Sequence, residues 1–518
     1  MTRLLELPPE LLSRIVDLVA IGETSETDCE DEEVNQDCKT KYKIDNGPSA
    51  TGLSYQHSML AITPHPDVIS LRNLRLASRG FARMCATRLF NCVRLLPTEE
   101  SSVRYNQILS EPVLSSQVRK VVFQTRMVPG GSTSCWSRQK PGPGDDYSRP
   151  HLFFMDALQQ VGCFPNLTHV EMVFGSQCVG PDSFNETTER VRFREGVLSA
   201  FYAGLNHREH PASKVFNLSI KNLQDRTPHA LIDSDEDEDE AVRDIKFRKD
   251  FEQVMSRITH LSLQIATEDE EAAPEMTLDL PESHNFFAHE LKEYWIAPIA
   301  ENLVYFKLYA CNMLFGTFPA CDLPKLPKLR TLILGNLSMC NEDHIDWILS
   351  HAATLEELIL DDAVVAVGTV LYAEVADEAS RRIIYSPLTI EDGRPLCQPE
   401  LDHALPKRRW LWLTRWHHIF GRLQRSLPNL KHFAIGHGNW DEHKAFDEAE
   451  ILQNVLTDAR YQYLDRGTGP DNWLVAEGDD KAFNDWEEDE EDIEFQPECD
   501  EEDWRALKEF IDQLQRRR

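Results

Sequence analysis

Three segments of the chain repeat one pattern of apolar and polar positions. Each begins at a leucine (Leu303, Leu329 or Leu355), and apolar residues follow at the third and fifth positions after it. The three starts are 26 residues apart, twice. Alternation of this kind predicts short strands with one buried face. A fixed period further predicts that successive strands stack side by side as structural repeats.

Weaker copies of the same apolar spacing occur before and after these three. They start at Val118, Leu167, Val215, Ile258 and Leu430. The full pattern, L-x-x-L-x-L-x-x-C/N, resembles the leucine-rich repeat. The resemblance implies an α/β fold over about 96–440: an irregular solenoid of parallel strands with helices on its convex side. Within it we expect inserts at about 127–150, 230–245, 266–285 and 366–408.

Residues that alternate with the inward leucines should line the concave face of such a solenoid. The set is mixed, with aromatic residues and both signs of charge, as protein-binding surfaces are. For any single position, ordinary solvated surface is the competing interpretation. The candidate substrate-binding residues are Tyr305, Lys307, Tyr309, Thr331, Ile333, Glu357, Ile359 and Asp361. Similar positions in the weaker copies include His169, Glu171, Lys221, His260 and His432.

The first 95 residues predict a small helical module that an insert interrupts. Pro8 and Pro9 suit a helix start, and Leu11, Leu12 and Ile15 then share one face. Residues 21–66 are acidic and then rich in Gly, Pro and Ser, which predicts a disordered insert. Helical spacing resumes at Val68. Helices this short cannot form a stable core alone, so they need a partner or the rest of the chain.

The two halves of this module together resemble an F-box. The first half reads Leu-Pro-x-Glu-Leu at 7–11, and the second reads Leu-Arg-Leu-Ala-Ser-Arg-x-Phe at 74–81. The resemblance implies docking on the Skp adaptor and, through it, on a cullin scaffold. The residues that it implies for the adaptor contact are Leu7, Pro8, Leu11, Ile15, Leu71, Leu74 and Phe81. The alternative is a helical cap on the repeats.

The acidic residues of the chain are concentrated in a few segments. The chain of 518 residues has 54 Lys and Arg against 87 Asp and Glu, a net charge of −33. Four runs (23–37, 233–240, 268–271 and 477–503) hold 35 of the acids and one base, so the rest is nearly neutral. This balance argues against binding nucleic acid or an anionic membrane. We expect an acidic tail over 441–518 that ends in an amphipathic helix at about 502–515.

Two further segments have two interpretations each. Residues 407–426 predict an amphipathic helix with Trp412, Trp416, Ile419 and Leu423 on one face. That helix either packs under the Leu430 strand or presents its basic start, 407–409, to phosphate or an acidic partner. Ser234, which acids follow, is a candidate phosphorylation site or simply part of a solvated acidic run.

The sequence holds no recognisable catalytic constellation. His207 with His210, and His417 with His418, lack the companions that a zinc site needs. No nucleophile motif or phosphate-binding loop has the required spacing. We therefore expect no enzyme activity, no metal and no cofactor. The twelve scattered cysteines, the absence of a long apolar segment and the acids within the first 20 residues predict a location in the cytoplasm, the nucleus or both.

These features together favour one function and keep a second open. The first is the substrate-recognition subunit of a cullin–RING ubiquitin ligase of the SCF type, whose repeats bind an unknown target protein. The second is a non-catalytic scaffold, or a chaperone-like binder of basic proteins, in which the acidic runs do the binding.

Overall fold

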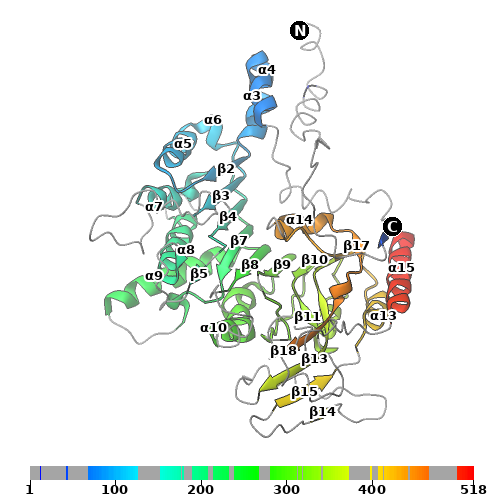
Figure 1. Cartoon of the computed structure of the whole chain (residues 1–518). Helices are drawn as coiled ribbons and strands as arrows, with labels where there is room; N and C mark the ends of the chain where they lie inside the picture. The colour runs from blue at the N-terminus through cyan, green and yellow to red at the C-terminus, as the bar shows by residue number, and fades with distance from the viewer. Residues whose placement is uncertain are drawn as a thin grey trace, which may run out of the picture. The chain divides into compact units, whose positions relative to one another are not determined.

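The computed structural model has a mixed α/β fold with large parallel sheet structure and many helices (Figure 1). Its contacts divide the chain into two compact units. Unit 1 comprises 1–37, 48–221 and 233–258, and unit 2 comprises 38–47, 222–232 and 259–518. The structure describes residues 12, 43–44, 68–125, 152–176, 178–179, 189–207, 214–232, 238–267, 281–311, 313–317, 319–339, 342–372, 397–398, 407–411, 414–440, 444–465 and 499–517.

Unit 1 alternates strands with helices. Its parallel strands run in the order β7, β4, β3, β2, and the last three residues of β7 are counted in unit 2. Helices α7, α8 and α9 lie beside one another along these strands (Figure 1). The elements are α3 (Val68–Ala77), α4 (Arg79–Leu89), β2 (Cys92–Leu95), α5 (Glu99–Ser110), α6 (Pro112–Ser115), β3 (Lys120–Gln124), α7 (Leu152–Gln159), η2 (Val161–Cys163), β4 (His169–Val173), β5 (Cys178–Val179), β6 (Glu189–Arg190), α8 (Val191–Leu205), β7 (Asn217–Gln224) and α9 (Glu238–Met255).

Unit 2 contains the parallel strands β8, β9, β10, β12 and β16 in that order, and a second, smaller sheet. Its first elements are β1 (Lys43–Ile44), η3 (His229–Leu231), β8 (His260–Ala266), α10 (Pro281–Asn285), η5 (Phe286–Ile296), η6 (Ala297–Ile299), β9 (Tyr305–Ala310), β10 (Thr331–Gly335), β11 (Ser338–Met339), α11 (Glu342–Leu349) and β12 (Glu357–Asp361). Then follow β13 (Val364–Tyr372), β14 (Cys397–Gln398), β15 (Lys407–Leu411), α13 (Trp416–Ser426), β16 (His432–Gly436), α14 (Ala445–Glu448), η7 (Ala449–Ile451), β17 (Asn454–Val455), η8 (Asp458–Arg460), β18 (Tyr461–Asp465) and α15 (Asp500–Arg517).

The 26-residue period of the sequence is the register of the sheet in unit 2. Thr331 pairs with Tyr305 on one side and with Glu357 on the other, so each residue lies beside its equivalent 26 positions away. The strands also leave the sheet alike, because Asn336 and Asp362 both have positive φ angles, of 64° and 48°. Asn and Asp tolerate this left-handed conformation better than other residues with a side chain. The prediction of parallel strands from the spacing is confirmed.

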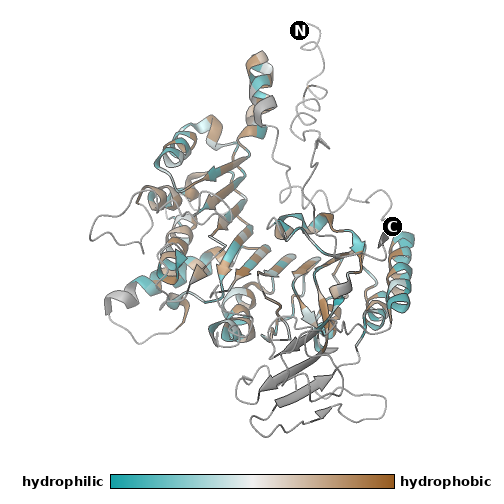
Figure 2. Ribbon diagram, viewed as in Figure 1, coloured by the Kyte–Doolittle hydropathy of each residue, from teal (hydrophilic) through white to brown (hydrophobic). Residues whose placement is uncertain are grey.

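The weaker copies also form strands where the pattern predicts them. They correspond to β3, β4, β7, β8 and β16, each paired in parallel. The inward-facing residues of the repeats are buried, as Phe306, Leu332 and Leu358 illustrate. Brown, apolar residues recur along the parallel strands of both units (Figure 2). Burial of these residues is the main favourable contribution to folding of each unit.

The segment 407–426 differs from its predicted single helix. Residues 407–411 form strand β15, which pairs antiparallel with β13, and helix α13 starts only at Trp416. Strand pairing therefore prevails over helical periodicity in the first five residues. The second part agrees with the packing interpretation, because Trp416, Ile419 and Leu423 are buried and the neighbouring Phe420 ring meets Phe433 of β16. Trp412 lies outside the described residues.

Two predicted inserts and the tail contain regular structure. Helix α9 begins at Glu238, inside the range 230–245, and β13 occupies the start of the range 366–408. The terminal amphipathic helix is confirmed as α15, with Leu507, Phe510 and Leu514 buried. No helix among the described residues is both long and apolar enough to cross a bilayer.

Candidate functional site

The eight candidate substrate-binding residues lie together on one face of the parallel strands of unit 2. Side chains alternate between the two faces of a strand, and the register aligns equivalent positions of β9, β10, β12 and β16. Three cross-strand rows result: Tyr305, Thr331, Glu357 and His432; then Lys307, Ile333, Ile359 and Ala434; then Tyr309, Gly335, Asp361 and Gly436. We call this surface the strand face.

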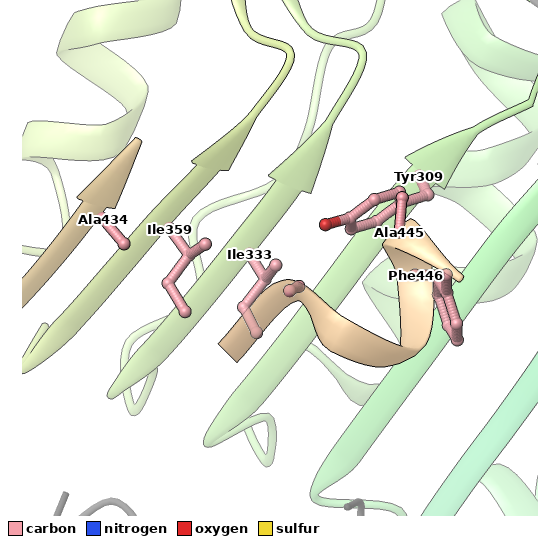
Figure 3. Close-up of a cluster of buried hydrophobic side chains, with 7 residues drawn as sticks. Tyr309, Ile333, Ile359, Ala434, Ala445 and Phe446 are labelled. Atoms are coloured by element: carbon pink, nitrogen blue, oxygen red, sulfur yellow. The ribbon is translucent and has the colours of Figure 1, made fainter. Parts of the chain in front are cut away.

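The strand face is covered, whereas the sequence predicts an open surface. Residues 437–440 and 444–452, which we call the strap, follow β16 and pack against residues of β9, β10 and β12. Ala445 and Phe446 of α14 lie beside Tyr309 and share one buried cluster with Ile333 (Figure 3). Tyr309, Ile333 and Ile359 are buried as a result. The expectation that these three positions are solvated is wrong, because a segment of the same chain occupies the face.

Small residues allow the strap to approach so closely. A Cβ atom on Gly436 would lie 2.6 Å from the carbonyl oxygen of Gln453, and one on Gly438 would lie 2.6 Å from Asp361 Oδ2. A Cβ atom on Gly335 would lie 2.3 Å from the ring of Tyr309. These contacts are shorter than side-chain carbons adopt, so glycine is required at all three positions. The alanines of the cluster, Ala434, Ala445 and Ala449, complete the close packing.

One end of the strap is held through Glu450. Its Oε1 atom accepts a hydrogen bond of 2.9 Å from the Tyr305 hydroxyl and lies 3.7 Å from Lys307 Nζ, which is buried. The Lys307 ammonium also lies 4.3 Å from the centre of the Phe446 ring, in cation–π geometry. Burial, together with Glu450, holds the pKa of Tyr305 well above its usual value, so Tyr305 remains a hydrogen-bond donor.

The other end of the strap is held through Asp361. Its two oxygens accept hydrogen bonds of 2.7 Å from the Tyr309 hydroxyl and from the backbone N–H of Gly438. Burial raises the pKa of Asp361 to about 6, helped by the neighbouring charge of Asp362 and opposed by these hydrogen bonds. This carboxyl therefore titrates at a pH where ordinary aspartates are fully ionised.

The remaining candidates lie at the rim. Thr331 is half-buried, and Glu357 accepts a hydrogen bond of 2.8 Å from the His432 ring across β12 and β16. The His437 ring lies 2.8 Å from the Asp362 carboxylate, just beyond the strand ends. All eight candidates are thus brought together, six of them buried and engaged inside the protein.

The corresponding strand positions in unit 1 carry a line of three charges. Glu171 on β4 lies 2.6 Å from Lys120 Nζ on β3 and 3.4 Å from Lys221 Nζ on β7. Burial alone would raise the pKa of Glu171, but the two lysines outweigh it and lower the pKa to about 2. On the neighbouring strand β2, Cys92 and Arg94 are exposed.

The structure describes only part of the predicted adaptor contact. Leu7, Pro8, Leu11 and Ile15 lie outside the described residues, as does Ser234. Leu71 and Phe81 are buried in a small cluster with Leu12 and Cys85, while Leu74 is half-buried beside them. Leu76, on the same helix α3, is 85% exposed. The three candidates that are described thus come together, and the exposed leucine next to them is one that the sequence reasoning did not select.

A polar cluster that the sequence analysis missed ties α15 to α13. His417 Nδ1, Cys499 Sγ and a carboxylate oxygen of Asp503 lie within 4.8 Å of one another, a donor set that could hold a metal ion. However, Asp503 already accepts hydrogen bonds from Arg460 Nε at 3.1 Å and from the Tyr461 hydroxyl at 2.7 Å. The Arg460 guanidinium supplies the positive charge there, so the geometry favours an ion-pair network. More than 80 residues separate His417 from the other two donors, so no local motif reveals it.

Unit 2 also has a cavity of about 580 Å³ away from these residues. The π-helix η5 forms one wall, and Phe315, Leu334, Leu337 and Trp347 supply apolar surface. His344 Nε2 lies 3.0 Å from the Gly316 carbonyl oxygen, and burial lowers the pKa of His344, so its ring is neutral at pH 7. Cavities of this volume are typical of small-molecule sites.

No protein-family model matches this chain, and no curated protein is significantly similar to it. Its function is therefore inferred from its own residues.

Proposed function

We propose that this protein is the substrate receptor of an SCF-type cullin–RING ubiquitin ligase. In this proposal residues 1–95 are an F-box that docks on the Skp adaptor, and leucine-rich repeats bind the target. The observation that supports it best is the cluster of Leu12 with Leu71 and Phe81. These residues come from the two halves of the F-box-like pattern, and an insert of about 45 residues separates the halves in sequence.

The repeats support the second half of the proposal. A 26-residue register, buried leucines at alternate positions and a left-handed residue after two successive strands are all features that leucine-rich repeats would produce. The turns before the strands also recur, because Leu329 N and Leu430 N donate to the carbonyl oxygens three residues earlier, at 3.1 and 3.4 Å. A repeated unit of this kind offers a long protein-binding surface without an active site.

A receptor of this type acts by positioning its target protein. It would hold a target lysine close to the ubiquitin carrier, which raises the effective concentration of the reacting groups. No nucleophile, base or metal is needed in the receptor itself. The alternative, an acidic binder of basic proteins, is favoured by the net charge of −33. Against it, two acids of the last acidic run, Asp500 and Asp503, are engaged by Arg460 within unit 2.

The test is co-purification with the Skp adaptor in 0.5 M salt. At this ionic strength the screening length is on the order of 4 Å, so interactions between exposed charges are largely lost and apolar contacts persist. Leu76→Asp places a charge on the exposed apolar position of α3 without entering the buried cluster. Leu152→Asp is the matched control, because Leu152 is a comparably exposed leucine, at 79%, on helix α7. We expect the natural chain and the Leu152→Asp variant to retain the adaptor and the Leu76→Asp variant to lose it. A folded natural chain that retains no adaptor contradicts the proposal.

A further inference from the structure

We propose that the strand face of unit 2 is a target-binding surface that the strap occupies as an internal mimic. The partner that fits it is a protein segment forming a short helix, with an aromatic residue and, four positions later, a glutamate. This inference rests on the proposed receptor function and names the class of target that the receptor would bind.

The strand face recognises two side chains of the strap. The Phe446 ring lies 4.3 Å from the Lys307 ammonium and forms a T-shaped pair with the Tyr309 ring, with ring centres 5.4 Å apart. The Glu450 carboxylate meets the Tyr305 hydroxyl and the same Lys307. Phe446 lies in α14 and Glu450 in the adjoining 3-10 helix η7, and both side chains meet Lys307 of the face.

Alanines set the second requirement on a partner. Ala445 and Ala449 are also four residues apart, and both are buried against the face. Their small side chains let the helix backbone lie close to Ile333 and Ile359, which present flat apolar surface between the polar ends. The motif expected in the target is therefore Ala-Phe-x-x-Ala-Glu, as in residues 445–450 of the strap.

The strap occupies this site imperfectly. Glu450 Oε2 is buried and has no hydrogen-bond partner among the described residues. The Lys307–Glu450 distance of 3.7 Å is too long for a hydrogen bond. Buried polar groups normally have hydrogen-bond partners. A partner whose carboxylate comes closer to Lys307 would form the charged hydrogen bond that the strap does not form.

The helical pieces of the strap are too short to be stable without the packing of this face. Helix α14 is four residues long and η7 three, far below the length at which a helix is stable alone. The adjacent Ile451 is 65% exposed. After the strap, Asn454 Oδ1 accepts a hydrogen bond of 3.0 Å from Ile435 N, and β17 pairs with β1. Because β16 and β17 have these bonds of their own, we expect the strap to leave the face while both strands stay in place.

The experiment measures binding of a fluorescent synthetic peptide with the sequence of residues 439–453 to the full chain. In the natural chain the tethered strap competes at a high effective concentration. The Phe446→Ala, Glu450→Gln double variant weakens that competitor and leaves the strand face intact. We expect it to bind the peptide about tenfold more tightly than the natural chain does. The control variant, Ile451→Ser, changes an exposed strap residue and should bind as the natural chain does.

The peptide supplies a second arm. A peptide with the same two substitutions should show at least a tenfold loss of affinity, because it lacks both recognised groups. Equal affinity of the natural chain and the double variant for the unsubstituted peptide would overturn the inference. These measurements need no adaptor. A negative peptide result is therefore distinguishable from a negative result for adaptor binding.

Hydrogen exchange of the natural chain keeps the test independent of any variant. Local opening of the strap should let the amides of α14 and η7 exchange at least about tenfold faster than those of β10 and β12. Equal protection of the strap and the strands would mean that the strap opens only when unit 2 unfolds. That result would also overturn the inference.

Discussion

Gly335 is the position where one added methyl group tests the packing of the strand face. A Cβ atom there would lie 2.3 Å from two ring carbons of Tyr309, while ordinary contacts begin near 3.4 Å. The ring must therefore move by about 1.1 Å, the difference between these two distances. Trp440 and Phe446 lie against the same ring, with centres 5.5 and 5.4 Å away, so the ring has little room to move.

The expected cost of Gly335→Ala follows from two terms. Overpacking a full core costs about 1–3 kcal/mol. Movement of the ring also weakens the 2.7 Å hydrogen bond from Tyr309 to Asp361, and hydrogen bonds to charged groups contribute about 1.5–3 kcal/mol. Because the ring can relax partly, we expect a total loss of about 3 kcal/mol in the free energy of unfolding, measured by urea denaturation at pH 7.

Two control substitutions separate the clash with the Tyr309 ring from other effects of an added methyl group. Gly196→Ala adds a methyl group inside helix α8 with nothing within 4 Å, so it should stabilise by up to about 1 kcal/mol. In a Tyr309→Ala background the obstructing ring is gone, and Gly335→Ala should then cost less than about 0.5 kcal/mol. An equal cost of Gly335→Ala with and without the Tyr309 ring would refute the argument.

Three further substitutions test other contacts by urea denaturation. Asp361 has a folded-state pKa of about 6, above its unfolded value, so ionisation of this carboxyl lowers the stability of the protein as pH rises from about 4 to 6. The natural chain should therefore lose roughly 3 kcal/mol more than the Asp361→Asn variant over this pH range. The pKa of Glu171 is shifted in the opposite direction, down to about 2, so its ionised form stabilises the protein. Glu171→Gln should lower the free energy of unfolding by about 3 kcal/mol at pH 7, and the two chains should be nearly equal in stability near pH 2. A pH-independent effect of either substitution would contradict its assignment. Gly204→Ala would bring a Cβ atom to 2.5 Å from the Leu158 carbonyl oxygen, so it should destabilise unit 1 by about 1–3 kcal/mol; stabilisation would mean that α7 and α8 separate easily.

The repeats could be predicted from the sequence because each one depends on its own residues and its neighbours. Leu329, Leu332 and Leu334 predict a strand locally, and the 26-residue period predicts which strands pair. The same alternation correctly places Tyr305 and Asp361 on one face. Secondary structure was predicted less well at 407–411, because pairing with β13 depends on a segment that is distant in sequence.

The strap could not be predicted in the same way. It offers only a few small or aromatic apolar residues, such as Ala445 and Phe446, within an acidic stretch, and its helix is too short for periodicity to detect. Burial of Lys307 and Asp361 depends on these residues of a different segment, so their own sequence context indicates solvated positions. The one available signal was the presence of Ile333 and Ile359 where a solvated face should be polar.

The affinity of the purified natural chain for the Skp adaptor, measured by calorimetry at 0.15 and 0.5 M salt, decides whether this protein can act as an SCF-type receptor. An apolar F-box contact predicts measurable binding whose dissociation constant changes less than about threefold between the two salt concentrations. Binding that disappears at 0.5 M salt would favour the acidic scaffold instead. A folded chain that binds no adaptor at either concentration would contradict the receptor account.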